Sequence, residues 1–336
     1  MRDIELRGEQ DLHVFEHEIP ELKEGELLIK TARCGICGTD VHSYYGETIF
    51  GKVFPFHIGH EVCGYVEKVQ SSNSTFEVGD LAVINPFFTC NSCPACLMDR
   101  SNDCENKTTI GLKGPGGYSE YIIVPETSTL KVKKGFDINR LTLAEPLADI
   151  IYAKEKLEIN SQMRVLIVGV GSIGLMFLQL MKGHMLKSLA ASDFNNNKLE
   201  KALKLGADVV YNPQNNDKIT EKYEIIIDCT GSAASVKQDI NYLAFGGQLL
   251  SFGVCKSDAV IEVSPFDLYK LDAKFISSFA LNKSSMQKSL AMLYSSSFNS
   301  DIVIDSVRPV SQLEECLKEI HDGKVDGKII IDTTAM

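Results

Sequence analysis

Hydrophobic and polar positions change their spacing along the chain and divide it into three stretches. Up to about residue 132, short apolar runs are interrupted by Gly and Pro, which favours strands joined by irregular loops. From residue 164 to residue 279, compact apolar runs alternate with segments of helical period, which is typical of a parallel sheet covered by helices. After residue 281, helix and strand patterns alternate again.

The first stretch shows strand patterns in three places and ends at a helix. We predict strands at 26–30, 65–69 and 118–124. A helix is predicted over 142–157, because Pro146 stands where a first helical turn accepts proline. Around residues 34 to 42, two glycines predict a loosened backbone.

The second stretch predicts a doubly wound α/β unit. Its strands are expected at 165–168, 186–192, 207–210, 223–228, 247–252 and 274–279, and its helices at 175–181, 198–205 and 233–243. The last stretch predicts helices at 285–293 and 313–321 and strands at 302–307 and 328–332. The final strand needs a sheet to join, so we expect the tail to return to the first domain. The predicted domains are 1–152, 153–283 and the returning segment 284–336.

Length and charge limit the classes of function. A chain of 336 residues exceeds what one simple core supports and favours two domains. Its net charge of −11, with no evident basic face, argues against nucleic acid or an anionic membrane as a partner. The chain has no apolar run of transmembrane length and no apolar segment of a secretory signal at its start. We therefore expect a cytoplasmic protein with reduced thiols.

Four cysteines in one short polar loop, at about 88–106, form the most specific signal. Their spacing is two, two and seven residues, and they are Cys90, Cys93, Cys96 and Cys104. Four thiolates close a tetrahedron around zinc and leave no open position, which defines a structural site. Disulfides and an iron–sulfur cluster are the alternatives. Disulfides conflict with the expected compartment, and nothing else in the sequence indicates electron transfer.

A second group of possible ligands is spread over separate segments. The stretch around Cys37 also carries Thr39 and His42, while His60 and Glu61 follow a glycine and Glu145 opens the predicted helix. Cysteine, histidine and carboxylate ligands with one position left open are typical of a catalytic zinc. Taken singly, each has an ordinary alternative: a core thiol, a packed histidine, or an acid favoured by the helix dipole.

A glycine-rich turn predicts a dinucleotide site. Gly169, Gly171 and Gly174 follow a strand and open a helix, with Ser172 and Ile173 between them. The helix N-terminus then faces the pyrophosphate. Asp193, at the end of the next strand, would bond the ribose hydroxyls and repel a 2′-phosphate, which favours NAD over NADP. Lys198 weakens this preference, because it could reach a phosphate.

Taken in order, these motifs resemble those of zinc-dependent medium-chain alcohol dehydrogenases over nearly the whole chain, including Glu145-Pro146 and the closing 323–328 segment. The likeness is strongest to the polyol branch, which contains sorbitol, threonine, butanediol, galactitol-phosphate and sugar-acid dehydrogenases. It implies a GroES-like, β-rich catalytic domain and a Rossmann domain.

The resemblance also implies roles for single residues. Cys37 and His60 would bind a catalytic zinc, with Glu61 and Glu145 binding it directly or through water. Thr39 and His42 would carry the alcohol proton toward solvent. The residues that would line the nicotinamide side are Thr230, Gly253 and Val254.

The predicted function is NAD-linked oxidation of a secondary alcohol of a polyol, sugar acid or sugar or polyol phosphate to a ketone. Two zinc ions per chain and a homodimer or homotetramer are expected with it. The alternatives are an NADP-linked aldehyde or ketone reductase and a non-catalytic nucleotide-binding protein on the same fold. Lys52, Lys113 and the pair Tyr44-Tyr45 are candidates for positions near the cleft, where a lysine would suit a phosphate or carboxylate on the substrate. Solvated surface positions are an equal alternative for all four.

Overall fold

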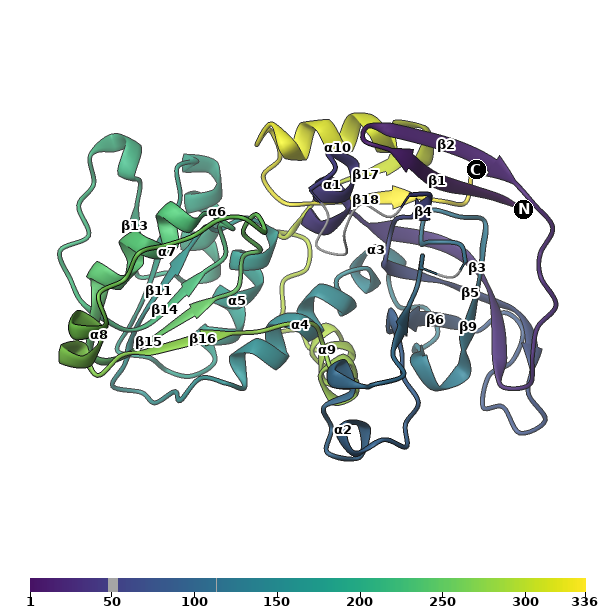
Figure 1. Ribbon diagram of the computed structural model, residues 1–336, viewed down its shortest axis with the longest axis horizontal. Helices are drawn as coiled ribbons and strands as arrows, with labels where there is room; N and C mark the ends of the chain where they lie inside the picture. The colour runs from purple at the N-terminus through teal and green to yellow at the C-terminus, as the bar shows by residue number, and fades with distance from the viewer. Residues whose placement is uncertain (48–53, 113) are drawn as a thin grey trace. The chain divides into compact units, whose positions relative to one another are not determined.

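The structure is a computed structural model that describes residues 1–47, 54–112 and 114–336. The chain divides into two compact units (Figure 1). The first unit contains Met1–Ala148 together with Leu281–Met336, and the second unit contains Asp149–Ala280. Within the described ranges, no helix has the length and apolar composition needed to cross a membrane.

The second unit is built on a six-stranded sheet in which every neighbouring pair is parallel. Its strands are β11 (Arg164–Val168), β12 (Ser188–Ser192), β13 (Val209–Tyr211), β14 (Tyr223–Asp228), β15 (Leu243–Ser251) and β16 (Lys274–Ser277). The order β13-β12-β11-β14-β15-β16 is the doubly wound order of Rossmann folds. The predicted fold class is confirmed, and the direction of winding reverses between β11 and β14.

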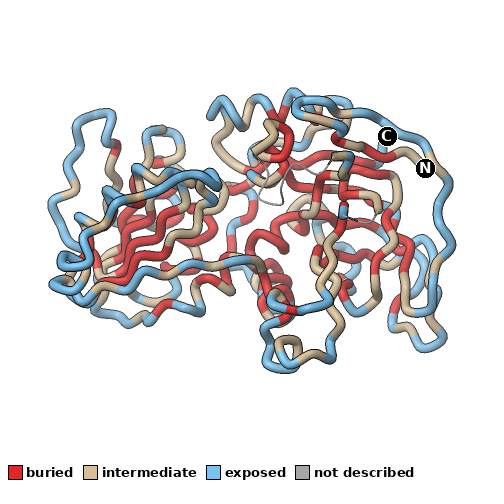
Figure 2. The backbone as a smooth tube through the Cα atoms, viewed as in Figure 1, coloured by how far each residue is buried: buried red, intermediate tan, exposed pale blue. Residues whose placement is uncertain are grey.

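Hydrophobic runs explain the central strands of this sheet. The side chains of β11 and β14 are largely buried, as parallel strands covered on both faces require (Figure 2). Its helices are α5 (Ser172–Lys182), α6 (Asn196–Leu205), α7 (Ala233–Asp239) and α8 (Pro265–Leu271). The predicted helix 233–243 was too long, because a 3-10 turn follows Asp239 and Leu243 already begins β15. Helix α8 was not predicted.

The first unit has a mixed sheet with β3 (Glu26–Gly35) at its centre. Strand β3 pairs antiparallel with β5 (Glu61–Gln70), β9 (Tyr121–Pro125) and β18 (Lys328–Asp332). The other strands of this sheet are β6 (Leu81–Ile84), β10 (Thr129–Lys131) and β17 (Ile304–Pro309). Because β18 lies beside β3, Ile331 stands opposite Cys34, and the returning tail of the chain joins the main sheet of the first unit.

Smaller elements complete the first unit. They are β1 (Arg2–Gly8), β2 (Asp11–Glu16), β4 (Phe56–His57), β7 (Phe87–Phe88), β8 (Thr108–Thr109), α1 (Gly38–Tyr44), α2 (Pro94–Leu97), α3 (Ile138–Leu141), α4 (Ala144–Lys154), α9 (Lys283–Leu293) and α10 (Leu313–His321). Helix α4 opens in the first unit and continues into the second. Helix α10 buries Leu313, Cys316 and Leu317, three positions on one helical face, in the core of the first unit.

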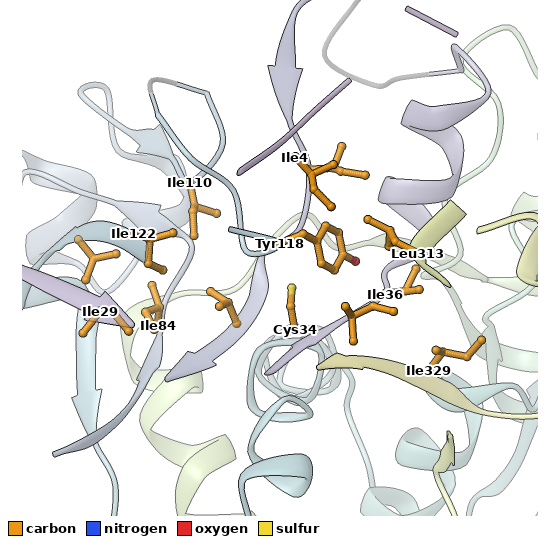
Figure 3. Packing of buried hydrophobic residues seen from close by; sticks show 14 of the residues in the cluster. Ile4, Ile29, Cys34, Ile36, Ile84, Ile110, Tyr118, Ile122, Leu313 and Ile329 are labelled. Carbon is orange, nitrogen blue, oxygen red and sulfur yellow. The ribbon is translucent and has the colours of Figure 1, made fainter. Parts of the chain in front are cut away.

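A fully buried tyrosine connects this core to the polar residues beside it. Tyr118 packs next to Cys34, Ile36 and Leu313 (Figure 3). Its hydroxyl donates to Asp40 Oδ2 at 2.9 Å and lies 3.1 Å from the carbonyl oxygen of Gly35. Burial is the main reason that the pKa of the Cys34 thiol is raised well above its ordinary value. Cys34 is therefore a core thiol.

Candidate active site

Cys37 initiates helix α1 through a capping box. Its sulfur accepts the backbone N–H of Thr39 at 3.5 Å, and Asp40 Oδ2 accepts the backbone N–H of Cys37 at 3.0 Å. The expectation of a loosened backbone was wrong at this point. Gly38 lies in the first turn of α1, and Gly35 ends β3, where a Cβ would overlap Glu61 Oε2. Gly35 therefore provides space for Glu61.

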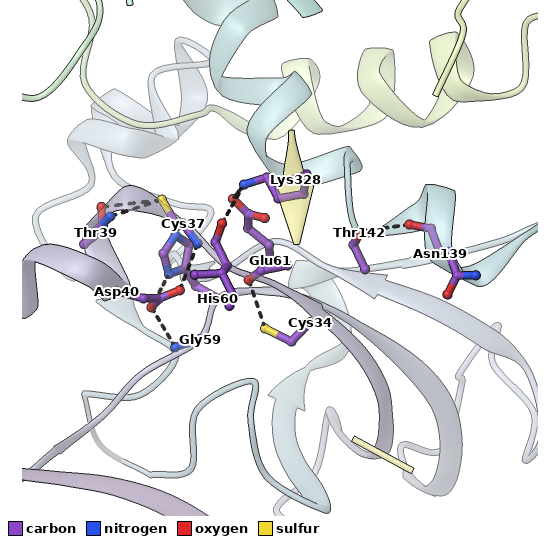
Figure 4. A network of polar contacts seen from close by, with 12 residues as sticks. Cys34, Cys37, Thr39, Asp40, Gly59, His60, Glu61, Asn139, Thr142 and Lys328 are labelled. Carbon is purple, nitrogen blue, oxygen red and sulfur yellow. Dashed lines mark hydrogen bonds and ion pairs between the residues drawn. The ribbon is translucent and has the colours of Figure 1, made fainter. Parts of the chain in front are cut away.

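Asp40 joins the Cys37 segment to the His60 segment. Its Oδ1 accepts the backbone N–H of Gly59 at 3.0 Å, and it lies 3.7 Å from Nδ1 of His60 (Figure 4). The imidazole thus turns Nδ1 toward this carboxylate, which leaves Nε2 as the nitrogen available to a metal.

The structure brings Cys37, His60 and Glu61 together. One ligand atom from each lies within 4.8 Å of the others, from segments that are far apart in sequence. Burial opposes protonation of His60, but Cys37, Asp40 and Glu145 outweigh it and raise the pKa of His60 well above its ordinary value. Sulfur, nitrogen and carboxylate donors with this surplus of acidic groups fit a zinc ion.

Glu145 stands at the edge of this group. It is 4% exposed, and its carboxyl group acts electrostatically on His60 and Lys328. Among the residues that the structure describes, it is outside the set whose ligand atoms all lie within 4.8 Å. The structure therefore places Glu145 close to the candidate metal site but not within the three-residue group.

Lys328 is a residue of this site that the sequence did not reveal. Its Nζ donates to Glu61 Oε1 at 2.6 Å and to the carbonyl oxygen of Ile36 at 2.9 Å, and both charged side chains are at most 4% exposed. Burial lowers the pKa of Lys328, but Glu61 and Cys37 outweigh it, so the net shift is upward. Glu61 Oε2 has no hydrogen-bond partner within the described ranges, and its lone pairs remain available to a cation.

Thr39 and His42 share one face of α1. The Thr39 hydroxyl lies 3.6 Å from the sulfur of Cys37, and His42 Nδ1 lies 3.2 Å from Glu47 Oε2. Both side chains are half-buried. Residues three apart on a helix are neighbours, so the two side chains can serve one path.

The two tyrosines among the candidate substrate contacts have partners within the first unit. Tyr44 is buried, and its hydroxyl donates to Glu314 at 2.8 Å. The ring of Tyr45 stacks on His321 with centroids 3.9 Å apart. Lys52 and Lys113 lie outside the described residues.

The four cysteines of the loop also lie together. All four sulfurs are within 4.8 Å of one another, with Cys90 at 3.5 Å from Cys104 and 4.0 Å from Cys96. A tetrahedral ion with Zn–S bonds of about 2.3 Å sets its sulfurs about 3.8 Å apart. The observed sulfur–sulfur distances are longer than a disulfide bond and match those between the ligands of a single ion.

The cysteine loop is attached to the start of helix α9. The carbonyl oxygen of Asp99 accepts the side-chain amide of Asn282 at 2.8 Å, and its carboxylate accepts the Ser284 hydroxyl at 2.5 Å. Ser101 accepts the backbone N–H of Lys283 at 2.9 Å. A metal that orders this loop would therefore also hold the beginning of α9.

The glycine-rich turn in the second unit has the geometry of a phosphate site. Gly169 has a φ of +82°, and a Cβ on Gly174 would overlap the carbonyl oxygen of Gly169. Gly171 caps helix α5, and a Cβ built on it would meet nothing within 4 Å. Ser172 and Ile173 form the first turn of α5. Backbone N–H groups at an open helix N-terminus fit a pyrophosphate.

Asp193 joins this turn to the end of β12. Its Oδ2 accepts the backbone N–H of Val170 and its Oδ1 accepts that of Asn195, both at 2.9 Å. Lys198 lies in the first turn of α6, and its backbone N–H donates to Asn195. Each carboxylate oxygen of Asp193 keeps a further lone pair for a ribose hydroxyl.

Thr230, Gly253 and Val254 follow strands β14 and β15 at the same carboxyl edge. Thr230 donates to the side chain of Asp228, and the backbone N–H of Gly253 donates to the Asp228 carbonyl oxygen at 3.0 Å. Val254 is 48% exposed. The structure thus gathers the predicted cofactor residues around the place where the sheet reverses its winding.

Two family models match the two halves of this arrangement. The alcohol dehydrogenase GroES-like domain matches residues 23–134, and the zinc-binding dehydrogenase model matches residues 172–295. The chain belongs to the zinc-dependent medium-chain alcohol dehydrogenase family. As a member, it is an oxidoreductase that acts on CH–OH donors, and it falls in the polyol branch.

Relatives cover most of the chain. An L-threonine 3-dehydrogenase of Caldanaerobacter subterraneus subsp. tengcongensis is 29% identical over 76% of this chain and 77% of its own. A D-altritol 5-dehydrogenase of Agrobacterium fabrum is 29% identical over 82% of each chain. A Sinorhizobium meliloti 1021 protein classed as a zinc-binding dehydrogenase, solved with NADP, has a TM-score of 0.88 at 25% identity and covers 98% of both chains.

Replacing Lys328 by Met tests the buried ion pair. Glu61 would keep its charge in a buried position without a counter-ion, so we expect a loss of about 3–5 kcal/mol of stability. The midpoint of urea denaturation, followed by circular dichroism, measures this loss. The matched control is Lys324→Met, which breaks an exposed pair with Asp322 and should leave the midpoint nearly unchanged. Equal midpoints for the two variants would contradict the assignment.

Proposed function

We propose that the protein oxidises a secondary alcohol of a polyol, sugar acid or sugar or polyol phosphate to a ketone, with NAD as hydride acceptor. The observation that carries the proposal is the assembly of Cys37, His60 and Glu61 within 4.8 Å. A binding module has no need of a metal with an open coordination position. The non-catalytic alternative is therefore disfavoured.

Cys37, His60 and Glu61 would hold a zinc ion, with Glu145 completing the set directly or through water. Zinc supplies a Lewis acid that lowers the pKa of a substrate hydroxyl. The four-cysteine loop would hold a second zinc with a purely structural role, since its thiolates leave no open position.

The chain's own groups then handle the proton. The Thr39 hydroxyl, placed beside the Cys37 sulfur, would accept the proton of the substrate hydroxyl while it releases its own proton toward His42. His42 would then carry the proton toward solvent, with its Nδ1 held by Glu47. Asp40 holds the Cys37 and His60 segments together through its hydrogen bonds to the backbone N–H groups of Cys37 and Gly59.

The substrate class follows from the chemistry that the relatives share. L-Threonine 3-dehydrogenase and D-altritol 5-dehydrogenase both carry names of enzymes that oxidise a secondary alcohol inside a polar molecule. We propose that this chain likewise oxidises a secondary alcohol in a polar molecule.

Metal content and turnover test the proposal together. Wild-type protein should contain two zinc ions per chain, one for each cysteine-containing group, and should produce NADH from one member of a panel of polyols, sugar acids and their phosphates. Cys37→Ser should lose one zinc and all NADH production while still binding NADH. The matched variant Cys104→Ser should lose the other zinc. Full activity of Cys37→Ser would refute the catalytic metal site.

Coenzyme choice depends on Asp193. A carboxylate beside the adenosine ribose repels a 2′-phosphate, so we propose NAD as the coenzyme. The relative solved with NADP makes an NADP-linked reductase the competing function. Asp193→Ala should reduce the ratio of kcat/KM for NAD to kcat/KM for NADP by about tenfold or more, as removal of one charge repulsion of about 1.4 kcal/mol predicts. Asp267→Ala, at an exposed position on α8, is the control, and an unchanged ratio in Asp193→Ala would reject the role.

Edge strand β16 supports a homo-oligomer. Phe275 on this strand is 50% exposed, and Phe245, Phe266 and Tyr269 in the same unit are 65–80% exposed. Strand β16 lies at the edge of its sheet, and an edge strand offers backbone N–H and C=O groups that can pair with another chain. We propose that two copies pair through this edge.

Phe275→Glu should convert the oligomer to a lower mass, as measured by size-exclusion chromatography with light scattering. Val78→Glu, which changes a 70%-exposed position in the first unit, should leave the mass unchanged. An oligomer of the same mass in both variants would exclude β16 as the interface.

A further inference from the structure

Helix α1 carries three residues of the candidate active site and is held at both of its ends. Cys37 caps its beginning, and Thr39 and His42 lie within it. At its far end, Tyr44 and Tyr45 contact helix α10, which lies beside α1 in the first unit (Figure 1). One of these contacts joins residues that are 270 positions apart in sequence, so the returning tail of the chain reaches the helix that carries the site.

The last turn of α1 is hydrogen-bonded to α10 through Tyr44. The Tyr44 side chain is fully buried, and its hydroxyl donates to Glu314 Oε1 at 2.8 Å. Lys318, one turn further along α10, donates to the same oxygen at 2.7 Å and so orients the Glu314 carboxylate. Burial, followed by the hydrogen bond to Glu314, raises the pKa of Tyr44 to about 12, so the hydroxyl keeps its proton and remains the donor.

Further contacts hold the same turn of α1. The Tyr45 ring stacks on His321 of α10, with centroids 3.9 Å apart and ring planes inclined by 23°. The carbonyl oxygen of Tyr44 accepts the backbone N–H of Gln10 at 2.7 Å. Val41 and Tyr44 pack in the core cluster that contains the buried face of α10. The last turn of α1 therefore cannot shift without breaking contacts to α10.

The position of the last turn determines where the first turn lies. A helix of seven residues is about 10 Å long, and its internal hydrogen bonds make it move as one body. A tilt of about 3° at the last turn would displace the first turn by about 0.5 Å, which is the tolerance of a functional constellation. Cys37 and Thr39 lie at this first turn, so a tilt of α1 changes the distance from the Cys37 sulfur to His60.

We propose that Glu314 is a positioning residue for the candidate metal site: acting through Tyr44 and helix α1, it fixes the position of the Cys37 sulfur. In this scheme Glu314 acts only through α1 and is not a metal ligand. The inference rests on the proposed function of the first unit's metal group. It adds to that group a residue from the returning tail of the chain.

The zinc affinity of the full-length protein tests the proposal. The zinc bound per chain is measured over a series of free zinc concentrations buffered with EDTA. Cys37→Ser lacks the candidate catalytic site and identifies which step of the binding curve belongs to it. In Glu314→Ala and in Tyr44→Phe, the free zinc concentration that half-fills this site should rise about fivefold, because each variant removes one hydrogen bond. The step that belongs to the four-cysteine loop should stay where it is in wild type.

Three matched variants separate positioning from a general loss of stability. Glu314→Gln keeps an oxygen that accepts the Tyr44 hydroxyl, so its zinc affinity should stay within about twofold of wild type. Glu315→Ala removes an exposed acid from the same helix and should also stay within about twofold. Because Tyr44 and Glu314 act on one path, the double variant Tyr44→Phe/Glu314→Ala should lose no more affinity than either single variant.

Unchanged zinc affinity in Glu314→Ala would overturn the positioning role and leave the metal site itself intact. The same loss in Glu314→Gln as in Glu314→Ala would overturn the route through the Tyr44 hydrogen bond. Weaker binding at both zinc sites, together with a lower midpoint of urea denaturation, would show general destabilisation and would also overturn the role. Absence of zinc from the Cys37 group in wild type would overturn the proposed function and, with it, the inference.

Discussion

The buried carboxylate of Asp40 joins the two segments that carry the candidate metal ligands, and it connects both to the core of the first unit. It accepts N–H groups from Cys37 and Gly59 and the hydroxyl of Tyr118. Cys37 belongs to the start of α1, Gly59 directly precedes His60, and Tyr118 fills the core of the first unit. One side chain thus fixes the spacing between a sulfur and a nitrogen ligand and connects both to the hydrophobic packing. The metal group depends on this connection more than on any local motif.

The two units accommodate a buried carboxyl group in different ways. In the first unit, the cation of Lys328 balances Glu61, so a carboxylate can remain ionised although it is 1% exposed. In the second unit, Asp239 is 2% exposed, and burial is the main reason that its pKa is raised to about 9, so it keeps its proton near neutral pH. A buried carboxyl group is energetically costly unless it is paired with a cation or keeps its proton.

Much of the fold could be predicted from periodicity, because α10 and the core strands bury regular apolar faces. The glycine turn and the cysteine loop were found because their ligands are close together in sequence. Helix α1 was missed because its cap is a thiol paired with Asp40, a capping signal that is rare. Lys328 was missed because a lysine in a strand is usually exposed, and only the pairing of β18 with β3 reveals its contact with Glu61.

The central position of β3 has a consequence for how the protein is made. The second unit is one continuous segment, Asp149–Ala280, and all of its strands are available once that segment has left the ribosome. The main sheet of the first unit cannot be completed at that stage, because β18, which pairs with β3, is synthesised later. The ion pair between Glu61 and Lys328 can therefore form only after β18 has been synthesised. Until then, the growing chain carries an unfinished sheet edge and an uncompensated acid at its future metal site.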